Sequence, residues 1–175
     1  MTTDIRRVRD DEWEQVRDLR LAALQDDAAP VAFLETHDQA ASEPAAFWQG
    51  RTSGGASSDS VAQFVAVSAD AFVGTVTVLV QEAGTLDHHS RPVESRQAVV
   101  VGVYVRPEHR GSGVVDELFE AAAEWTRGRG IGVLTLDVHS ANARAQAAYR
   151  RAGFLPSGES FTSVIGPEIG MVRTL

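Results

Sequence analysis

Apolar side chains recur every three or four positions between Trp13 and Leu24, which predicts a helix with one buried face. A short run at residues 5–8 predicts a strand before it. Asp11 and Glu14 have the spacing of a capping box, in which a carboxylate accepts hydrogen bonds from the free amides of the first helical turn. The N-terminal end is therefore expected to form a strand and an amphipathic helix.

Residues 28–51 have a less regular pattern, typical of helix, loop and helix, and Pro44 suits the first turn of the second helix. The Ser- and Gly-rich stretch at 52–60 predicts a flexible loop. Two runs rich in Val, Phe and Thr follow at 61–67 and 72–80, and the short polar turn between them predicts an antiparallel hairpin. We therefore expect helices first and a hairpin after them.

Strands and helices alternate in the second half of the chain, after a polar stretch at 82–96 that predicts a long surface loop. The expected elements are a strand at 98–106, a helix at 113–127, a strand at 133–138, a helix at 142–152 and two short strands after it, with 171–175 closing the sheet. A strand, a helix and a strand in succession imply a parallel pair with a right-handed crossover, whereas hairpins imply antiparallel pairs. The predicted fold class is α/β (α+β), with a mixed, largely antiparallel sheet flanked by about four helices.

Composition and charge narrow the functional classes. The chain has 175 residues, of which 43% are hydrophobic and 23% charged, as in one globular domain with one core. Its charged start lacks a secretory signal, and its longest apolar run, 98–105, is too short to cross a membrane, so we expect a cytoplasmic protein with no membrane partner. The formal net charge of -8 argues against nucleic acid as a partner.

The chain has no cysteine. Disulfides, thiolate metal sites and a cysteine nucleophile are therefore excluded, and an acyl group cannot rest on a protein thiol. The adjacent His88 and His89 are typical metal ligands, but no acidic or histidine partner lies at ligand spacing in the sequence. We therefore expect no metal site.

Arg110, Gly111, Ser112 and Gly113 join the end of a predicted strand to the start of a predicted helix. A helix start offers free amides and a positive dipole end, glycines let a ligand approach the backbone, and an arginine adds a cation, which together suit a phosphate or pyrophosphate. A tight strand-to-helix turn would need the same glycines, so the loop alone leaves both interpretations open. A P-loop is excluded because no Lys-Ser/Thr pair follows, and a Rossmann fingerprint would need a third glycine.

Two linked motifs resemble those of the GNAT acyltransferases. The stretch from Val103 to Val114 is similar to the acetyl-CoA signature of that family, Arg/Gln-x-x-Gly-x-Gly/Ala preceded by a strand that ends in Val-x-Pro. The second motif follows at the distance that the family shows, and its residues are Asn142, Ala145, Tyr149, Gly153 and Phe154. The resemblance covers most of the chain, and its specific part is residues 99–154.

The resemblance implies a GNAT fold with one splayed parallel strand pair, and acetyl-CoA as the cosubstrate. It implies a single domain at 1–175, with substrate-side helices and a loop at 1–60, an acetyl-CoA-binding core at 61–154 and C-terminal strands at 155–175. Backbone groups of one strand would bind the pantetheine arm, at Val103, Tyr104 and Val105. The pyrophosphate would lie on the amides of Gly111, Ser112, Gly113, Val114, Val115 and Asp116.

The resemblance also implies individual roles. Arg110 would shape the pyrophosphate loop, Asn142 would contact the cofactor arm, and Tyr149 would point its hydroxyl at the cofactor sulfur. A phenol with a pKa of about 10 can protonate a thiolate whose conjugate acid has a pKa of about 8.5, although an aromatic here would also pack the helix on the sheet. Val115 departs from the small residue that ends the family motif, and its β-branched side chain needs room.

Acetyl transfer to an amine needs a proton acceptor and a polarised carbonyl. Asp137 is the first candidate for the general base, as an acid on the strand before the second motif, and the alternative is a solvated strand residue. Glu94, His88 and His89, or an ordered water, are further candidates. Gly102 in mid-strand indicates either a bulge that re-aims backbone amides or an accommodation of a neighbouring aromatic.

Substrate contacts are expected from the N-terminal helices and the polar loops, at Arg20, Trp48, Arg51 and Glu94, although Trp48 also suits the core. The expected function is direct transfer of acetyl from acetyl-CoA to a primary amine of a small molecule or protein, in a ternary complex. The alternative is a non-catalytic module that senses acyl-CoA, which Val115 favours. Since members of this family are often dimers, a homodimer is compatible with the sequence.

Overall fold

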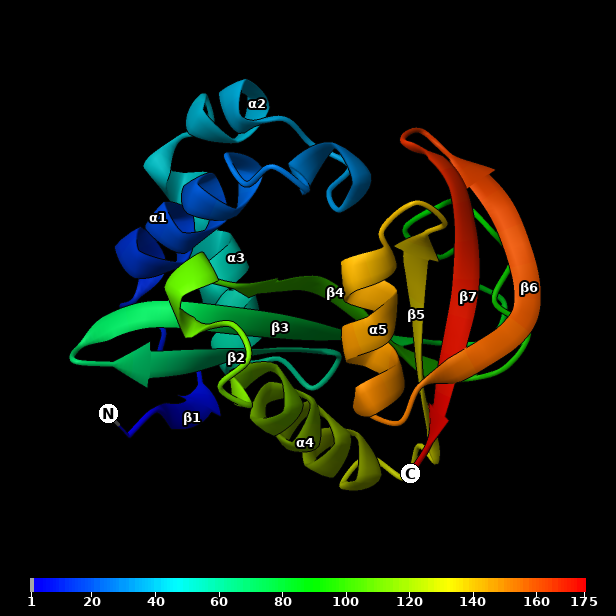
Figure 1. Ribbon diagram of the computed structural model, residues 1–175. Coiled ribbons are helices and arrows are strands. Elements are labelled where there is room, and N and C mark those ends of the chain that lie inside the picture. The colour runs from blue at the N-terminus through cyan, green and yellow to red at the C-terminus, as the bar shows by residue number, and fades with distance from the viewer. Residues whose placement is uncertain (1) are drawn as a thin grey trace.

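The computed structural model describes residues 2–175, which form a seven-stranded sheet with helices on both faces (Figure 1). The strands are β1 (Asp4–Arg7), β2 (Val61–Ser68), β3 (Ala71–Gln81), β4 (Gln97–Val105), β5 (Val133–His139), β6 (Leu155–Ser163) and β7 (Gly166–Thr174). The helices are α1 (Trp13–Leu24), α2 (His37–Ala41), α3 (Ala45–Ser57), α4 (Val114–Arg127) and α5 (Ala143–Arg151), with short 3-10 helices at Ala29–Val31 and Pro107–His109. Within residues 2–175, no helix has both the length and the apolar character to cross a bilayer.

The sheet has the strand order β1-β2-β3-β4-β5-β7-β6 and is antiparallel except between β4 and β5. These two strands pair only at Ala98 with Leu134 and at Val99 with Thr135, and then they separate. The predicted mixed, largely antiparallel sheet with one splayed parallel pair is therefore confirmed. Strand β7 lies between β5 and β6, so β6 ends the sheet, rather than the last strand as the sequence had indicated.

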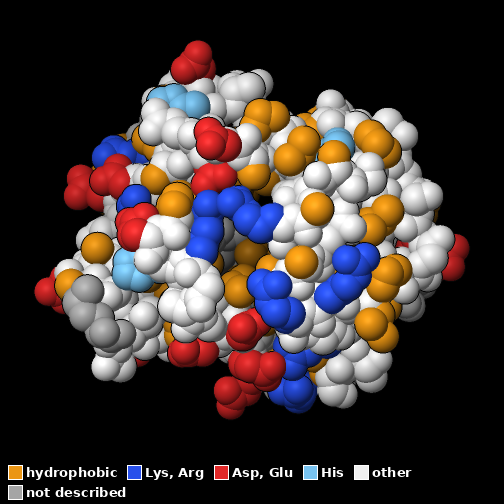
Figure 2. Space-filling model, in the orientation of Figure 1, with side chains coloured by type: hydrophobic (Ala, Val, Ile, Leu, Met, Phe, Trp, Pro, Cys, Tyr) orange, Lys and Arg blue, Asp and Glu red, His pale blue; other side chains and the backbone are white. Residues whose placement is uncertain are grey.

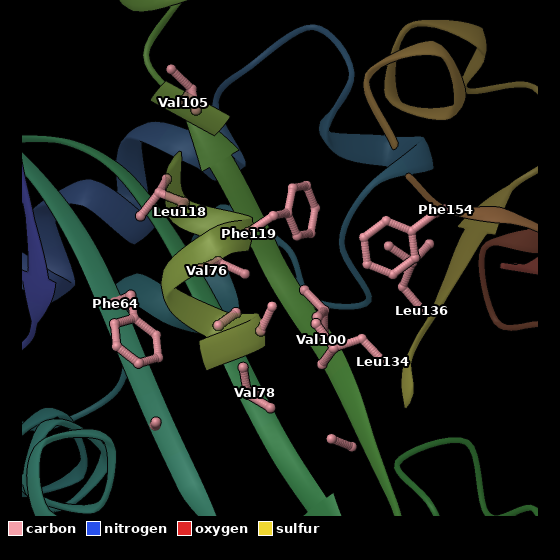
Figure 3. Packing of buried hydrophobic residues seen from close by; sticks show 14 of the residues in the cluster. Phe64, Val76, Val78, Val100, Val105, Leu118, Phe119, Leu134, Leu136 and Phe154 are labelled. Atoms are coloured by element: carbon pink, nitrogen blue, oxygen red, sulfur yellow. The ribbon is translucent and has the colours of Figure 1, made fainter. Parts of the chain in front are cut away.

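Two apolar clusters hold the helices on the sheet. On one face Leu118 and Phe119 of α4 pack against Val76, Leu134 and Phe154, and all five are fully buried (Figure 3). Burying one such side chain contributes about 1.5–3 kcal/mol. The apolar stripe of α4 thus fixes the start of this helix at the end of β4.

On the other face, α1 and α3 pack over β2, β3 and β4. Their cluster includes Leu19 and Trp48 from the helices, Val65 from β2 and Tyr104 from β4. The spacing of apolar residues in α1 predicted this face, since Val16, Leu19, Ala23 and Leu24 are all buried. The N-terminal helices are therefore anchored directly over the strand that carries the first motif.

Helix α3 continues into the stretch 52–60, as far as Ser57, so the prediction of a flexible loop there is wrong. Gly55 packs so closely on β2 that a Cβ built on it would lie 2.9 Å from the Cβ of Gln63. The Gly55 carbonyl also accepts a hydrogen bond from the Nε of Arg7 at 2.8 Å. Glycine at this position therefore allows close packing and does not confer flexibility.

The capping box predicted from Asp11 and Glu14 does not form. The N-cap of α1 is Glu12, whose side chain makes no capping hydrogen bond to the helix. Its carboxylate accepts instead from the amide of Arg9 at 2.8 Å and from the guanidinium of Arg6. These competing partners occupy the carboxylate that a cap would need.

Candidate active site

A pocket of about 410 Å³ lies where β4 and β5 separate. Its walls come from both strands, the start of α4, α5, the N-terminal helical region and the loop 82–96. Figure 2 shows the hollow in this face of the molecule, with arginine side chains gathered around it. The arginines on the pocket wall are Arg20, Arg51, Arg110, Arg144 and Arg151. The segments expected to hold the cofactor and those expected to meet the acceptor thus border one cavity.

Strand β4 bulges at Gly102, where φ is 64° and the pairing with β3 shifts between Thr75 and Thr77. A Cβ at Gly102 would have no neighbour within 4 Å. The glycine is therefore needed for its backbone conformation and not to make room for an aromatic. Of the two interpretations that the sequence left open, the bulge is confirmed.

Beyond Val99, β4 has no strand partner on its β5 side within residues 2–175. Val103, Tyr104 and Val105 border the pocket there. The side chain of Tyr104 is 8% exposed in the cluster under α1 and α3, and burial raises its pKa. This strand can therefore offer backbone groups to an extended ligand, in the way that a sheet edge accepts an added strand.

The turn between β4 and α4 has the geometry of an anion site. Gly111 and Gly113 have φ values of 73° and 89°, which L side chains rarely adopt, and Gly113 is the N-cap of α4. No neighbouring protein atom lies within 4 Å of a Cβ built on either glycine. The first-turn residues that border the pocket are Val114, Val115 and Asp116. Their amides have no partner inside the helix, so an anion in the open space beside them would be favoured.

Arg110 stabilises this turn through two hydrogen bonds. Its Nε donates a hydrogen bond to the Val105 carbonyl at 2.9 Å, and a terminal nitrogen donates to the carboxylate of Asp26. Ser112 is exposed at the tip of the turn, where its hydroxyl donates to the His109 carbonyl at 2.6 Å. The charge of Arg110 is thus committed to Asp26, and its role in the structure is to shape the loop.

Asp26, which the sequence did not single out, connects three segments of the pocket. Its carboxylate also accepts from the amide of Ala28 at 3.0 Å and lies 3.4 Å from the guanidinium of Arg144 on α5. Burial alone would raise the pKa of Asp26, but the hydrogen bonds from Arg110 and Ala28 outweigh it and lower the pKa. A charged Asp26 therefore holds the segment after α1, the glycine turn and α5 together.

Helix α5 brings the second motif to the pocket. Asn142 is its N-cap, and the Oδ1 atom accepts from the amide of Ala145 at 3.2 Å. Tyr149 borders the pocket and packs edge-on against Phe119, with 5.7 Å between ring centroids. Burial raises the pKa of Tyr149 to about 12. The phenol therefore keeps its proton at neutral pH, and a ligand in the pocket can use it as a donor.

The loop 82–96 folds onto β5 through a charged network. Asp87 accepts hydrogen bonds from the amides of His89 and Arg91, and from the Nε of Arg91, each at 2.8 Å. Arg91 donates in turn to Asp137 at 2.6 Å, and Asp137 lies 3.8 Å from the Nε2 of His89. The carboxylate expected as the general base is therefore held in an ion pair with Arg91.

His88 borders the pocket beside this network. The His88 side chain is exposed, but partial desolvation beside the pocket lowers its pKa, and the neighbouring His89 lowers it further, although Asp137 acts in the opposite direction. Its ring is therefore neutral at about pH 7 and can accept a proton.

The ligand atoms of His88, His89 and Asp137 lie within 4.8 Å of one another, a cluster that sequence spacing did not reveal. A metal ion at this cluster would compete with Arg91 for the carboxylate.

The N-terminal helices supply two arginines to the pocket wall. Arg20 donates from its Nε to Glu35 at 2.6 Å and stacks on the ring of Phe33 at 4.5 Å. The guanidinium of Arg51 makes no hydrogen bond and no ion pair with any residue from 2 to 175, and it lies 5.8 Å from the centroid of the Trp48 ring. Of these two arginines, Arg20 has a paired charge and Arg51 does not.

Trp48 and Glu94 do not border the pocket. The expectation that Trp48 contacts substrate is corrected, because its side chain is buried, whereas a contact at Glu94 stays a prediction. Trp48 is 1% exposed, because its large apolar ring fills the core between α3 and α1. Glu94 is exposed, whereas its neighbour Val93 is buried.

Glu168 is a pocket residue that the sequence did not indicate, since an acid in a C-terminal strand resembles an ordinary surface residue. It is 4% exposed, borders the pocket, and makes no hydrogen bond or ion pair within residues 2–175. It lies directly opposite His139 in the pairing of β5 with β7. Directly opposed side chains share one face of a sheet, so Glu168 lies on the same face as His139 and Asp137.

Comparison with known proteins identifies the family. The model of the Acetyltransferase (GNAT) family matches residues 13–154. The chain is 42% identical over 60 residues to the streptothricin acetyltransferase of Streptomyces lavendulae, and this match covers 34% of this chain and 32% of that protein. It is 39% identical over 70 residues to the L-methionine sulfoximine/L-methionine sulfone acetyltransferase of Pseudomonas aeruginosa, and this match covers 39% of this chain and 41% of that protein.

Each match spans less than half the length of the relative. Among solved structures, the acetyltransferase of GNAT family from Streptococcus pneumoniae superposes with a TM-score of 0.76 and 17% identity, over 99% of each chain. This similarity shows the fold. Since the family model also covers most of the sequence, the chain belongs to the Acetyltransferase (GNAT) family.

Proposed function

We propose that the protein transfers the acetyl group of acetyl-CoA directly to a primary amine, in a ternary complex. One observation carries this proposal. The part of β4 that has no partner on its β5 side, the turn at Gly111 and Gly113, and Tyr149 all border one pocket. With no cysteine in the chain, the acyl group does not pass through a protein thiol, and the amine attacks the thioester itself.

In this proposal acetyl-CoA follows the strand and the helix start. Its pantetheine arm extends along Val103, Tyr104 and Val105, where β4 has no strand partner on its β5 side among residues 2–175. Its pyrophosphate lies on the first-turn amides of α4, and Asn142 contacts the arm from the start of α5. The acyl end then lies near the bulge at Gly102, which borders the same pocket as His88 and Arg51.

The chemistry requires one proton donor and one acceptor. The amine nitrogen attacks the carbonyl carbon, and the resulting oxyanion accepts hydrogen bonds from amides near the β4 bulge. The C–S bond then breaks, and Tyr149 donates its proton to the departing thiolate. Because both groups lie in the same cavity, desolvation raises the pKa of the thiol as it raises that of the phenol, so the difference between the two pKa values stays close to that in water.

The acceptor for the amine proton is His88 in this proposal. Its lowered pKa leaves the ring neutral and able to take the proton of the tetrahedral adduct. Asp137 assists His88 in two ways. Its charge favours the imidazolium that forms on His88, and its ion pair with Arg91 holds the loop 82–96 on β5. This arrangement gives Asp137 an electrostatic and positioning role beside the proton acceptor.

We propose a small-molecule amine as the acceptor. The names of both curated relatives describe acetyltransferases of small compounds, streptothricin and L-methionine derivatives. The pocket of about 410 Å³ must hold the reactive end of the cofactor as well, which leaves room for a small acceptor.

Two measurements test the proposal. Acetyl-CoA should raise the melting temperature of the protein, whereas ATP and NAD at equal concentration should not. Thiol release from acetyl-CoA should then depend on adding an amine from a broad panel of small amines. Stabilisation by acetyl-CoA without thiol release for any amine would contradict the enzymatic proposal and indicate an acyl-CoA sensor. The absence of any stabilisation would contradict the cofactor assignment itself.

A further inference from the structure

Two opposite charges without partners border the pocket. The guanidinium of Arg51 on α3 is exposed to the cavity and has no hydrogen-bonding or ionic partner among residues 2–175. The carboxylate of Glu168 on β7 is likewise unpartnered within those residues, although Glu168 is only 4% exposed. An unpaired charge with so little access to water is costly, so Glu168 favours a ligand of positive charge, whereas the exposed guanidinium of Arg51 is free to bind an anion.

The setting of Arg51 makes its charge unusually available. Its neighbour Arg20 is neutralised by Glu35, which accepts from both the Nε and a terminal nitrogen of Arg20 at 2.6 Å. Burial lowers the pKa of Arg51, and the charge of Arg20 lowers it further, while Glu35 acts in the opposite direction. An anion bound at Arg51 would offset the repulsion from Arg20.

The position of Arg51 separates it from the phosphate end of the cofactor. Arg51 and Gly102 both border a second, small cavity of about 20 Å³ that adjoins the helices, so Arg51 lies beside the β4 bulge. From Gly102 the strand runs on to Val105, about 10 Å further, before the glycine turn begins. The cofactor phosphates belong at that turn, so the anion that Arg51 faces is part of the acceptor.

Glu168 is suited to the other end of the same acceptor. It lies on the face of β5 and β7 that carries Asp137, and His88 approaches that carboxylate from the loop 82–96. Asp137 is already bound by Arg91, so of the two carboxylates on this face Glu168 is the one with capacity for a new cation. An ammonium group beside Glu168 would therefore lie near the proposed proton acceptor.

We propose that the acceptor is an amine that also bears a carboxylate, an amino acid in chemical class, with Arg51 binding the carboxylate and Glu168 facing the ammonium. A guanidinium fork matches the two oxygens of a carboxylate, and such paired hydrogen bonds are among the strongest that a side chain makes. The inference rests on the proposed function, because it names the substrate class of the same pocket.

The test compares L-amino acids with their matching carboxamides, which keep the amine and remove the negative charge. Thiol release is measured with acetyl-CoA, and binding to the CoA-loaded protein is measured separately by calorimetry. Wild-type protein should prefer amino acids. R51Q should raise the KM for amino acids about tenfold or more, leave the KM for carboxamides within about twofold, and leave the KM for acetyl-CoA unchanged. E168Q should raise the KM for both classes equally, because both carry the ammonium.

Arg17 offers a matched control, since it is an exposed arginine of α1 that pairs with Asp18 and does not border the pocket. R17Q should therefore behave as wild type. Equal use of carboxamides, a rise in the acetyl-CoA KM of R51Q, or no binding of any amino acid would overturn the inference. Thiol release with carboxamides would still support the proposed function, whereas R51Q-sensitive binding of amino acids without thiol release would overturn catalysis alone.

Discussion

Arg110 in the glycine turn donates a hydrogen bond to Asp26, a residue 84 positions earlier in the chain. The same guanidinium donates to the carbonyl of Val105 at the end of β4. The turn that starts α4 is therefore shaped by a carboxylate from the opposite side of the pocket. Because Asp26 also lies 3.4 Å from Arg144, the same contact links the turn to α5.

Asp26→Asn should weaken acetyl-CoA binding without abolishing the fold. Loss of the charge-assisted hydrogen bond removes about 1–3 kcal/mol of interaction and frees Arg110 to move, so the acetyl-CoA KM should rise several-fold. Asp27→Asn is the control, because Asp27 is exposed and its side chain makes no hydrogen bond or ion pair within residues 2–175. Steady-state kinetics with varied acetyl-CoA checks this, and equal values for the two variants would contradict it.

The pKa of Asp26 adds a pH dependence to the same variant. Because the folded pKa is lowered, the ionised carboxylate stabilises the protein above its unfolded pKa of about 4, and this stabilisation is lost as the pH falls through the folded pKa. The free energies of unfolding of wild type and Asp26→Asn should therefore differ at pH 7 and converge below about pH 4. Urea unfolding at both pH values measures the difference, and a gap that persists at low pH would oppose this origin.

Gly113→Ala should impair cofactor binding more than it impairs stability. A φ of 89° costs alanine about 1 kcal/mol, and no neighbouring protein atom lies within 4 Å of the new Cβ, so the fold should survive. The Cβ would instead occupy the space proposed for the pyrophosphate. Gly130 follows α4 with a φ of 72° and similarly open surroundings, so Gly130→Ala imposes comparable backbone strain without touching the cofactor.

Melting temperatures of these two variants should fall alike, while only Gly113→Ala loses stabilisation by acetyl-CoA. Val115→Gly should preserve or improve acetyl-CoA affinity, because it restores the small residue that ends the family motif. An unchanged acetyl-CoA affinity in Gly113→Ala would show that the pyrophosphate lies elsewhere.

The order of strands and helices was predictable, because the apolar spacing that indicates each element lies within a short stretch of the sequence. Leu118, Phe119 and Ala122 recur at helical spacing in α4, and all three are fully buried. The end of α3 was not predictable, because Gly55 is fixed by its contact with Gln63 of β2, which local propensity cannot show. Tertiary packing there overrides the flexibility that serine and glycine normally confer.

The candidate site divides in the same way. The glycines of the turn and Tyr149 belong to short motifs, so their spacing alone placed them in the predicted site. Asp137 and Arg91 are 46 positions apart and meet only because the loop 82–96 folds over β5. No sequence motif marks Glu168. It is of interest only because its carboxylate is buried beside the pocket and has no partner among residues 2–175.

Tyr149→Phe should lower kcat about a hundredfold and leave the acetyl-CoA KM within about twofold, because it removes only the proton donor. The melting temperature should hardly change, since the hydroxyl makes no hydrogen bond within residues 2–175. With a pKa of about 12, the wild-type phenol stays protonated, so the kcat of wild type should not decline up to about pH 10. A decline below that pH that disappears in Tyr149→Phe would contradict the raised pKa.

His88→Gln should remove the acidic limb of the pH–rate profile. The folded pKa of His88 is lowered from its ordinary value of 6.5, so the ring is neutral and active near pH 7 and becomes protonated and inactive only below that value. The kcat of wild type should therefore fall on acidification below pH 6.5, whereas the lower kcat of His88→Gln should follow amine ionisation alone. His37→Gln is the control, because His37 lies at the start of α2 and does not border the pocket. If His88→Gln retained both the wild-type kcat and the acidic limb, another group would be the proton acceptor, and Asp137→Asn measured in the same way would show whether that group is Asp137.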